Sequence, residues 1–453
     1  MKPSLTSALV PVLCLPLASA ALAGETVFPA RLAGHAVIPA HSLIAPPADA
    51  PRDAWISGKF ISGRIETPMS VEGTTGGLHG NRGTGLHYPF IGQPLQGFSG
   101  FAMNRAPDGA IYALTDNGFG SKANSPDALL FFHRIAPDFE AGTVDVRETV
   151  FLSDPDHVVP FRIAYEGTDS RYLTGADFDL ESIQVIGDTV WIGEEFGPYI
   201  LRATKGGVIT GVFPTMLEGA ELRSPDHPSV RVPAAAGKDW RVPRSGGYEG
   251  MALQPGTGLL WGMLEKPILN AEGAEEGSFL RVMAFDPAQA AWTGDSFKFA
   301  LAEGATAIGD FNFIDETRAL VIERDNGEGD PSLKCEGAPQ PDCFPNPAMI
   351  KRVVLIDTAQ VDAEGFVRRI GHVDLMDIAD PDGVSRLETV AARDLTGRFT
   401  MPFFTIEDVM AVDDTHILVA TDNNLPFSSG RQLDAAMDNE FVLLRVLEML
   451  SAR

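Results

Sequence analysis

Acidic side chains recur at both ends of apolar hairpins along this 453-residue chain. In "EDVMAVDDTHILVATDNN" (407–424), Glu407 opens one apolar run and Asp422 closes the next. The start of the first strand and the end of the second lie side by side in an antiparallel hairpin, so these acids are expected to converge. The predicted sets are Asp116 with Asn117, Glu181 with Glu194 and Glu195, Glu249 with Glu265, Asp310 with Glu323 and Asp325, and Glu407 with Asp422 and Asn423.

Oxygen-rich sets of this kind are typical of sites for hard cations. Carboxylates and Asn amides are ligands that Ca²⁺ prefers, and Mg²⁺ also accepts them. Crowded carboxylates repel one another by about 1–4 kcal/mol per close pair, and bound cations would offset that repulsion. The simpler interpretation is that Asp and Asn fill turns and end strands. Recurrence at the same place in successive hairpins favours a cation-binding face.

Basic residues accompany three of the acidic hairpins. Arg324 stands between two acids, Lys266 follows Glu265, and Arg431 follows the last hairpin. Each is either a clamp for an anionic group or a simple ion-pair partner. The chain contains no HExxH, GxSxG or GxxxxGK[ST] pattern, which disfavours a zinc peptidase, a nucleophile elbow and a P-loop.

The elements that would position these residues are short paired strands. The chain has 46 Gly and 33 Pro, and its apolar runs are brief and alternating, which indicates an all-β protein. Five hairpins share one plan, and a further strand follows each of them. The five hairpins span residues 98–118, 180–198, 248–267, 308–327 and 406–424.

Such repeats predict a β-propeller with long decorated loops. We expect six blades, five of them visible as repeats and a sixth assembled from "AWISGKFISGRIETP" (54–68). The alternative architecture is a pair of β-sandwiches. In a propeller the inner hairpins point the same way around the axis, so their ends would meet on one face near the centre.

The N-terminal residues 1–23 are expected to be a signal peptide cleaved at about Ala23, leaving residues 24–453 as a single domain. This predicts a periplasmic or secreted protein, with no later membrane span. Cys335 and Cys343 remain in the mature chain, and an oxidising compartment favours a disulfide between them over a pair of metal ligands. The formal charge of −26 excludes nucleic acid and anionic membranes as partners.

Several stretches resemble the bacterial phytase-like family, also labelled "esterase-like activity of phytase". They are "PLQGFSGF" (94–101), "DNGFGSKANSPDALLFFHRIAPDF" (116–139), "LTGADFDLESIQVIGDTVWIGEEFGPYIL" (173–201), "GGYEGMAL" (246–253), "ERDNGEGD" (323–330), "VDLMDIADPDG" (373–383), "TIEDV" (405–409) and "TDNNLPFSSGR" (421–431). The resemblance implies an exported β-propeller related in plan to calcium-dependent phytases, which hydrolyse phosphomonoesters.

The leading hypothesis is an exported Ca²⁺-dependent phosphoester hydrolase that takes a small anionic substrate through bound metal. Glu195 and Glu249 are predicted to act in catalysis, with Arg324 and Arg431 stabilising the developing charge. Two alternatives remain open at this point. One is a Ca²⁺-dependent carboxylester or lactone hydrolase, and the other is a non-catalytic periplasmic binding propeller with structural calcium.

Overall fold

The computed structural model describes residues 25–61, 63–65, 67–72, 83–338, 340, 343–386, 397–433 and 435–453. The predicted signal peptide lies outside these residues. The described chain is built almost entirely of strands, with one short α-helix, α2 (Leu447–Ser451), and two 3₁₀ turns, η1 (Arg52–Trp55) and η2 (Pro331–Leu333). None of its helices has the length and hydrophobicity needed to span a membrane.

Within the described residues, five four-stranded antiparallel units follow one another along the chain, and we refer to them as blades one to five. Blade one contains β9 (Phe98–Phe101), β10 (Ile111–Thr115), β11 (Phe131–Asp138) and β12 (Thr143–Phe151). Blade two contains β13 (Leu180–Ile186), β14 (Thr189–Glu194), β15 (Tyr199–Thr204) and β16 (Ile209–Pro214). Blade three contains β19 (Tyr248–Leu253), β20 (Leu260–Leu264), β21 (Phe279–Asp286) and β22 (Ala291–Ala300).

The last two blades use strands from the N-terminus. Blade four contains β23 (Ala307–Phe313), β24 (Arg318–Arg324), β25 (Lys351–Val361) and β26 (Val367–Asp374), and β1 (Thr26–Phe28) joins its outer edge in parallel. Blade five contains β29 (Asp408–Ala411), β30 (His416–Ala420) and β31 (Asn439–Arg445), and β2 (Arg31–Ile38) completes it. The two ends of the chain are therefore paired in one sheet.

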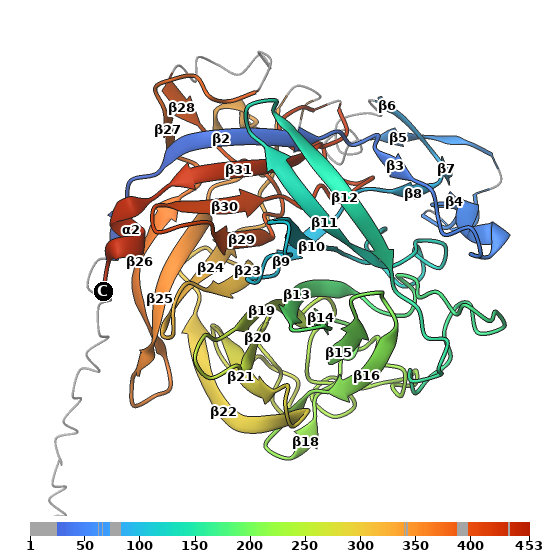
Figure 1. The fold of residues 1–453 in the computed structure, drawn as a ribbon. Coiled ribbons are helices and arrows are strands. Elements are labelled where there is room, and N and C mark those ends of the chain that lie inside the picture. The colour runs from blue at the N-terminus through green and yellow to red at the C-terminus, as the bar shows by residue number, and fades with distance from the viewer. Residues whose placement is uncertain are drawn as a thin grey trace, which may run out of the picture.

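The five blades form a closed ring. The inner strands β9, β13, β19, β23 and β29 lie around a common centre, each in contact with the next, and β29 returns to β9 (Figure 1). A separate hydrophobic cluster fills each of the five interfaces between neighbouring blades. The inner strands are buried on both faces because each lies between two other blades, and this burial includes the polar residues that they carry.

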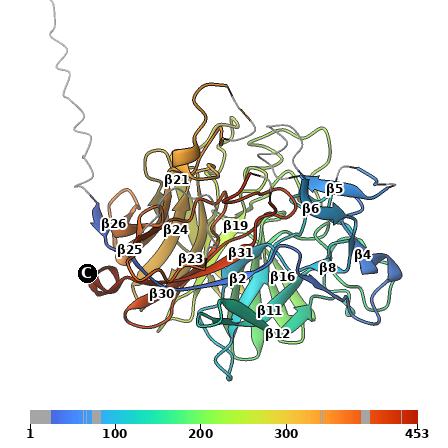
Figure 2. The ribbon, with the colours of Figure 1, turned by 90° about the horizontal axis from the view of Figure 1, so that it is seen from above.

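The β-propeller prediction is confirmed, but the expected sixth blade is not among the sheets of the described residues. The described residues between 54 and 68 instead belong to an N-terminal extension of small two-stranded sheets at one side of the ring (Figure 2). Its strands are β3 (Leu43–Ile44) with β8 (Gln93–Pro94), β4 (Ile56–Ser57) with β7 (Phe90–Ile91), and β5 (Met69–Glu72) with β6 (Gly83–Tyr88). Two similar pairs decorate the ring, β17 (Met216–Leu217) with β18 (Ala220–Glu221) and β27 (Ile378–Asp380) with β28 (Gly397–Phe399).

The disulfide prediction is also confirmed. Cys335 and Cys343 are bonded within the long connection from β24 to β25. The loop between them therefore does not offer two free thiolates to a metal ion.

Ring closure by β2 has a testable energetic consequence. Leu32 on β2 is buried in the cluster between blades four and five. We expect Leu32→Ala to lower the free energy of unfolding by about 2–5 kcal/mol, because it leaves a cavity at the closing strand. Leu447→Ala, at a side chain that is 43% exposed, is the matched control and should change stability little. Equal denaturant midpoints for both variants would show that β2 does not stabilise the closed ring.

Candidate metal centre in the central cavity

A cavity of about 300 Å³ lies at the centre of the ring, at the end where the inner strands begin. Its lining is dominated by ionisable side chains. The acids are Asp116, Asp179, Glu181, Glu195, Glu249, Glu265, Glu407 and Asp422, and the bases are Lys266 and Arg324. All eight acids are at least partly enclosed by the blades, so their charges lie close together in a region poor in water.

Each blade contributes two equivalent positions to the centre of the ring. Strand register places the first position at the start of the inner strand and the second at or just after the end of its hairpin partner. From blade one to blade five, the pairs are Ser99 with Asp116, Glu181 with Glu195, Glu249 with Glu265, Gly309 with Arg324, and Glu407 with Asp422. Blade four thus differs from the other blades, because it supplies the basic side chain of Arg324 and no acid.

The prediction for blade four was wrong by one residue. Asp310, Glu323 and Asp325 do not line the cavity, and Arg324 does. Successive side chains of a strand point to opposite faces, so a shift of one position moves a carboxylate away from the cavity.

The three displaced acids of blade four have other partners. Asp310 accepts hydrogen bonds from the amides of Phe311 at 2.7 Å and Val409 at 2.8 Å, which ties β23 to β29. Glu323 is paired with Arg369 at 2.9 Å. Asp325 is paired with Lys351 at 3.0 Å.

Glu194 shows the same one-residue offset in blade two. Its carboxylate accepts the amides of Phe196, Gly197 and Tyr199 at 2.7–2.8 Å, and it therefore shapes the turn after β14. Its neighbour Glu195 occupies the cavity position.

The two predicted amide ligands are placed differently. Asn117 lines the cavity, and its Nδ2 donates to Asp179 Oδ1 at 2.6 Å. Asn423 does not line it, because Oδ1 accepts from the Gly97 amide at 3.2 Å and Nδ2 donates to the Met437 carbonyl at 2.9 Å.

Asp179 is an acid of the cavity that the hairpin rule did not find. It directly precedes β13 and is two residues before Glu181. Residues i and i+2 of an extended chain lie on the same face, so the spacing "DLE" (179–181) was the signal available in the sequence. Ser99, Ser245 and Thr405 were also missed, since neutral polar residues are too common in loops to stand out.

Two groups of carboxylates in the described chain are close enough together to hold a metal ion. Asp179, Glu181 and Glu195 form one, and Glu195, Glu249 and Glu265 form the other, with the possible ligand atoms of each group within 4.8 Å of one another. Glu195 belongs to both groups. Its Oε1 is buried without a hydrogen-bond partner, and Glu249 Oε1 likewise makes no hydrogen bond. Carboxylate oxygens that lack donors fit a hard divalent cation such as Ca²⁺ or Mg²⁺.

The surroundings disfavour negative charge on these acids. Burial, followed by repulsion from Glu265, raises the pKa of Glu195 well above its ordinary value. Burial and repulsion from Glu407 do the same to the pKa of Glu249. Burial also raises the pKa of Asp179 to about 6. A divalent cation would reverse this effect, because its charge favours the ionised carboxylates.

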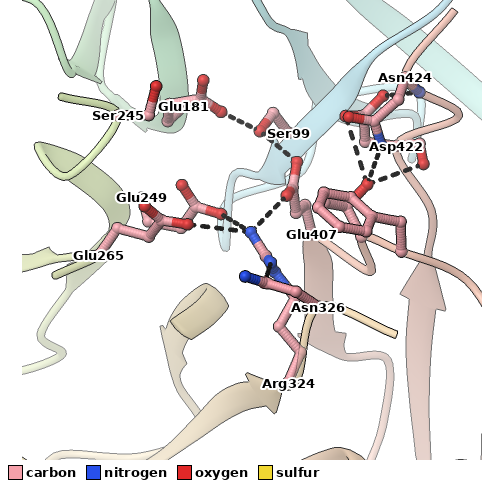
Figure 3. Close-up of polar contacts among 12 residues, drawn as sticks. Ser99, Glu181, Ser245, Glu249, Glu265, Arg324, Asn326, Glu407, Asp422 and Asn424 are labelled. Carbon is pink, nitrogen blue, oxygen red and sulfur yellow. Dashed lines mark hydrogen bonds and ion pairs between the residues drawn. The ribbon is translucent and has the colours of Figure 1, made fainter. Parts of the chain in front are cut away.

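Arg324 provides the internal counter-charge of the cavity. Its Nη2 lies 3.0 Å from Glu265, 3.4 Å from Glu407 and 3.6 Å from Glu249, so it joins blades three and five across blade four (Figure 3). Burial alone would lower the pKa of Arg324, but the three glutamates raise it above its ordinary value. Arg324 Nε is buried and makes no hydrogen bond.

Ser99 connects acids of blades two and five on the side of the cavity away from Arg324. Its hydroxyl contacts Glu181 by a short hydrogen bond and Glu407 at 3.2 Å, and Figure 3 shows it between the two carboxylates. A hydroxyl has one proton and can donate it to only one carboxylate at a time. Ser99 therefore supplies orientation and a single donor, whereas Arg324 supplies charge.

Arg431 does not reach the cavity. It forms two bonds to Glu440, at 2.7 and 2.9 Å, and its guanidinium stacks on Phe399 and Phe403 at 4.7–4.8 Å. His35 completes this group through a 3.0 Å contact with Glu440. The arrangement is that of a buried ion pair, and it does not support the predicted role of Arg431 in binding an anion.

Fold and site together define a β-propeller with a carboxylate-lined central cavity, an arrangement compatible with a metal-dependent hydrolase. A family model described as "Phytase-like: Esterase-like activity of phytase" matches residues 93–425. The chain belongs to this phytase-like family. A comparison with curated proteins found no match.

Solved structures with a similar course of the chain share little sequence with it. A luciferin-regenerating enzyme is 9% identical, with 79% of this chain and 94% of that chain covered at a TM-score of 0.35. The Bacillus subtilis arabinanase Arb43A is 12% identical, with coverages of 78% and 94% and a TM-score of 0.35. The aldose sugar dehydrogenase of Streptomyces coelicolor in its PQQ-bound form is 11% identical, with coverages of 84% and 98% and a TM-score of 0.32.

Removal of the internal counter-charge should destabilise the calcium-free protein. We expect Arg324→Gln to lower its free energy of unfolding by about 3–5 kcal/mol, because three buried glutamates lose their cation. Added calcium should recover part of the loss by binding the folded state. Thermal unfolding with and without calcium measures both effects. An unchanged melting temperature in EDTA would contradict this role of Arg324.

The Arg431–Glu440 ion pair should make the free energy of unfolding depend on pH in the acid range. Burial alone would raise the pKa of Glu440, but Arg431 and then His35 lower it from 4.5 to about 2. A pKa that is lower in the folded state stabilises the fold above the unfolded value, and this contribution is lost as pH falls from about 4.5 through about 2.

We therefore expect Arg431→Met to lower the free energy of unfolding by about 3–5 kcal/mol at pH 7, since it leaves the Glu440 carboxylate buried without its guanidinium partner. Calcium affinity should not change. Arg445→Met, at an exposed arginine of the same blade, is the control. Urea unfolding at several pH values tests this, and equal stability of the two variants at pH 7 would contradict it.

Proposed function

We propose that this protein is an exported, calcium-dependent phosphoester hydrolase whose active site is the central cavity. The observation that carries the proposal is the overlap of the two carboxylate groups at Glu195, whose buried Oε1 has no hydrogen-bond partner. Membership of the phytase-like family supports hydrolysis of an ester bond. The acids Asp179, Glu181, Glu195, Glu249 and Glu265 would hold the cations.

Calcium, when bound, would supply positive charge that attracts phosphate oxygens and acidifies a water molecule. The protein itself cannot attract an anion, because eight acids of the cavity face only Lys266 and Arg324. A small anionic substrate would therefore depend on the bound cation for its affinity. A cavity of about 300 Å³ admits a phosphate group with part of its alcohol.

The residues of the chain would orient the reacting groups. Arg324 would keep three glutamates in place through Nη2. Lys266 is bound to Glu265 at 2.9 Å and to the Arg244 carbonyl at 3.1 Å, which fixes the wall beside Glu265. Glu195 and Glu249 are the candidates for the carboxylate that takes a proton from the attacking water. Glu195 has a buried oxygen without a hydrogen-bond partner, and Glu249 Oε1 lies 3.6 Å from Arg324 Nη2.

Export is part of the proposal. It is supported by the predicted signal peptide at residues 1–23, with residues 24–453 as one mature domain, and by the Cys335–Cys343 disulfide. Disulfides persist in oxidising compartments such as the periplasm and the extracellular medium.

The proposal predicts phosphomonoesterase activity that EDTA removes and calcium restores. Glu195→Gln should lower calcium affinity by more than about 100-fold, because loss of a ligand shared by both groups should exceed the 10- to 100-fold effect of losing a residue that only supports a ligand. Activity at limiting calcium should fall in parallel. Glu364→Gln, at an exposed acid, serves as the control for loss of one negative charge.

Three outcomes of this assay distinguish the candidate functions. Calcium-dependent turnover of a phosphomonoester supports the proposal. Turnover restricted to chromogenic esters or lactones would replace it with a carboxylester or lactone hydrolase. Calcium-induced thermal stabilisation without turnover of any ester would indicate a binding propeller.

A further inference from the structure

Gly247 occupies a position at which three of the cavity glutamates meet. It directly precedes β19 at the interface between blades two and three. Its carbonyl accepts the amide of Glu265 at 2.8 Å and that of Glu249 at 3.2 Å. One peptide group is therefore bonded to the backbones of both acids that blade three contributes.

The other side of Gly247 packs against blade two. A Cβ added to Gly247 would lie 2.4 Å from Glu195 Cα, 2.9 Å from the Glu195 carbonyl oxygen and 3.0 Å from the Glu194 carbonyl oxygen. These neighbours are backbone atoms, which cannot rotate away as a flexible side chain would. Gly247 does not have a positive φ, so the requirement for glycine arises from this contact and not from backbone conformation.

The carbonyl bond recurs in blades one and two, where the residue is glycine in blade one and aspartate in blade two. The Gly97 carbonyl accepts the Asp116 amide at 2.8 Å, and the Asp179 carbonyl accepts the Glu195 amide at 2.9 Å. Blade two carries the acid Asp179 at this position and blade three carries glycine. The shared bond thus positions the second acid of each blade, and glycine at 247 additionally allows the Glu195 backbone to approach.

We infer that Gly247 is a positioning residue of the metal centre, setting Glu195, Glu249 and Glu265 at the separation that one cation requires. This inference rests on the proposed function, because it concerns the same carboxylates. A methyl group at position 247 would push the Glu195 backbone away from blade three. The group formed by the three glutamates would then open, while the Asp179–Glu181 side would keep its place.

The test is a calcium titration of the full mature chain, monitored by calorimetry at a temperature well below unfolding. Gly247→Ala is expected to lower calcium affinity at least tenfold. Gly371→Ala is the matched control, because its Cβ would lie 2.4 Å from the Thr26 carbonyl oxygen at the outer edge of blade four, far from the cavity. Gly371→Ala should keep the wild-type affinity, whatever its effect on the melting temperature of the calcium-free protein.

Each outcome decides between the positioning role and a packing role. Equal calcium affinity of wild type and Gly247→Ala would overturn the inference and leave the proposed function intact. Loss of affinity in both glycine variants would also overturn it, since general loosening would then explain the effect. Absence of calcium binding by the wild-type protein would contradict the proposed function itself, and the inference with it.

A measurement on the wild-type protein keeps the inference testable if Gly247→Ala does not fold. Because the Glu249 and Glu265 amides share the Gly247 carbonyl, calcium should slow hydrogen exchange of both amides together, by at least tenfold more than that of Gly371. Protection of only one of them, or of neither, would overturn the positioning role.

Discussion

Repulsion among the carboxylates at the centre of the ring is the constraint on which the rest of the structure depends. Closing five blades brings the starts of five inner strands together, and eight acids of the cavity then face two bases. Two carboxylates about 4 Å apart repel by about 1–4 kcal/mol at effective dielectric constants between 80 and 20. The five hydrophobic interfaces between blades supply the opposing free energy, and β2 secures the ring by pairing with β31.

The negative charge of the cavity is compensated in two different ways. Blade four places Arg324 where its neighbours carry an acid, and that guanidinium neutralises the side of the cavity between blades three and five. The carboxylates paired with Arg324 are those of Glu249, Glu265 and Glu407, whereas Asp179, Glu181 and Glu195 form a separate group on the side of blade two. A cation is the natural partner there, and Gly247 allows blades two and three to approach closely enough for their acids to share it.

The sequence was sufficient to predict the hairpins, the propeller and the convergence of acids, because strand alternation and turn residues are local signals. It also predicted the disulfide. It did not determine which residue of an adjacent pair faces the cavity. Glu194 and Glu323 precede the cavity position by one residue, and the register of both hairpins is interrupted by an irregularity that strand alternation does not predict. The position of Arg431 was equally hidden, since its partner Glu440 becomes a neighbour only after β31 pairs within blade five.

The central claim is that the cavity binds calcium through the carboxylates that share Glu195. Elemental analysis of the purified mature protein, after dialysis against calcium and then metal-free buffer, tests it most directly. The account predicts calcium retained in stoichiometric amount by the wild-type protein and lost from Glu195→Gln. A wild-type protein that retains no divalent metal, or a Glu195→Gln variant that retains as much calcium as the wild type, would contradict it.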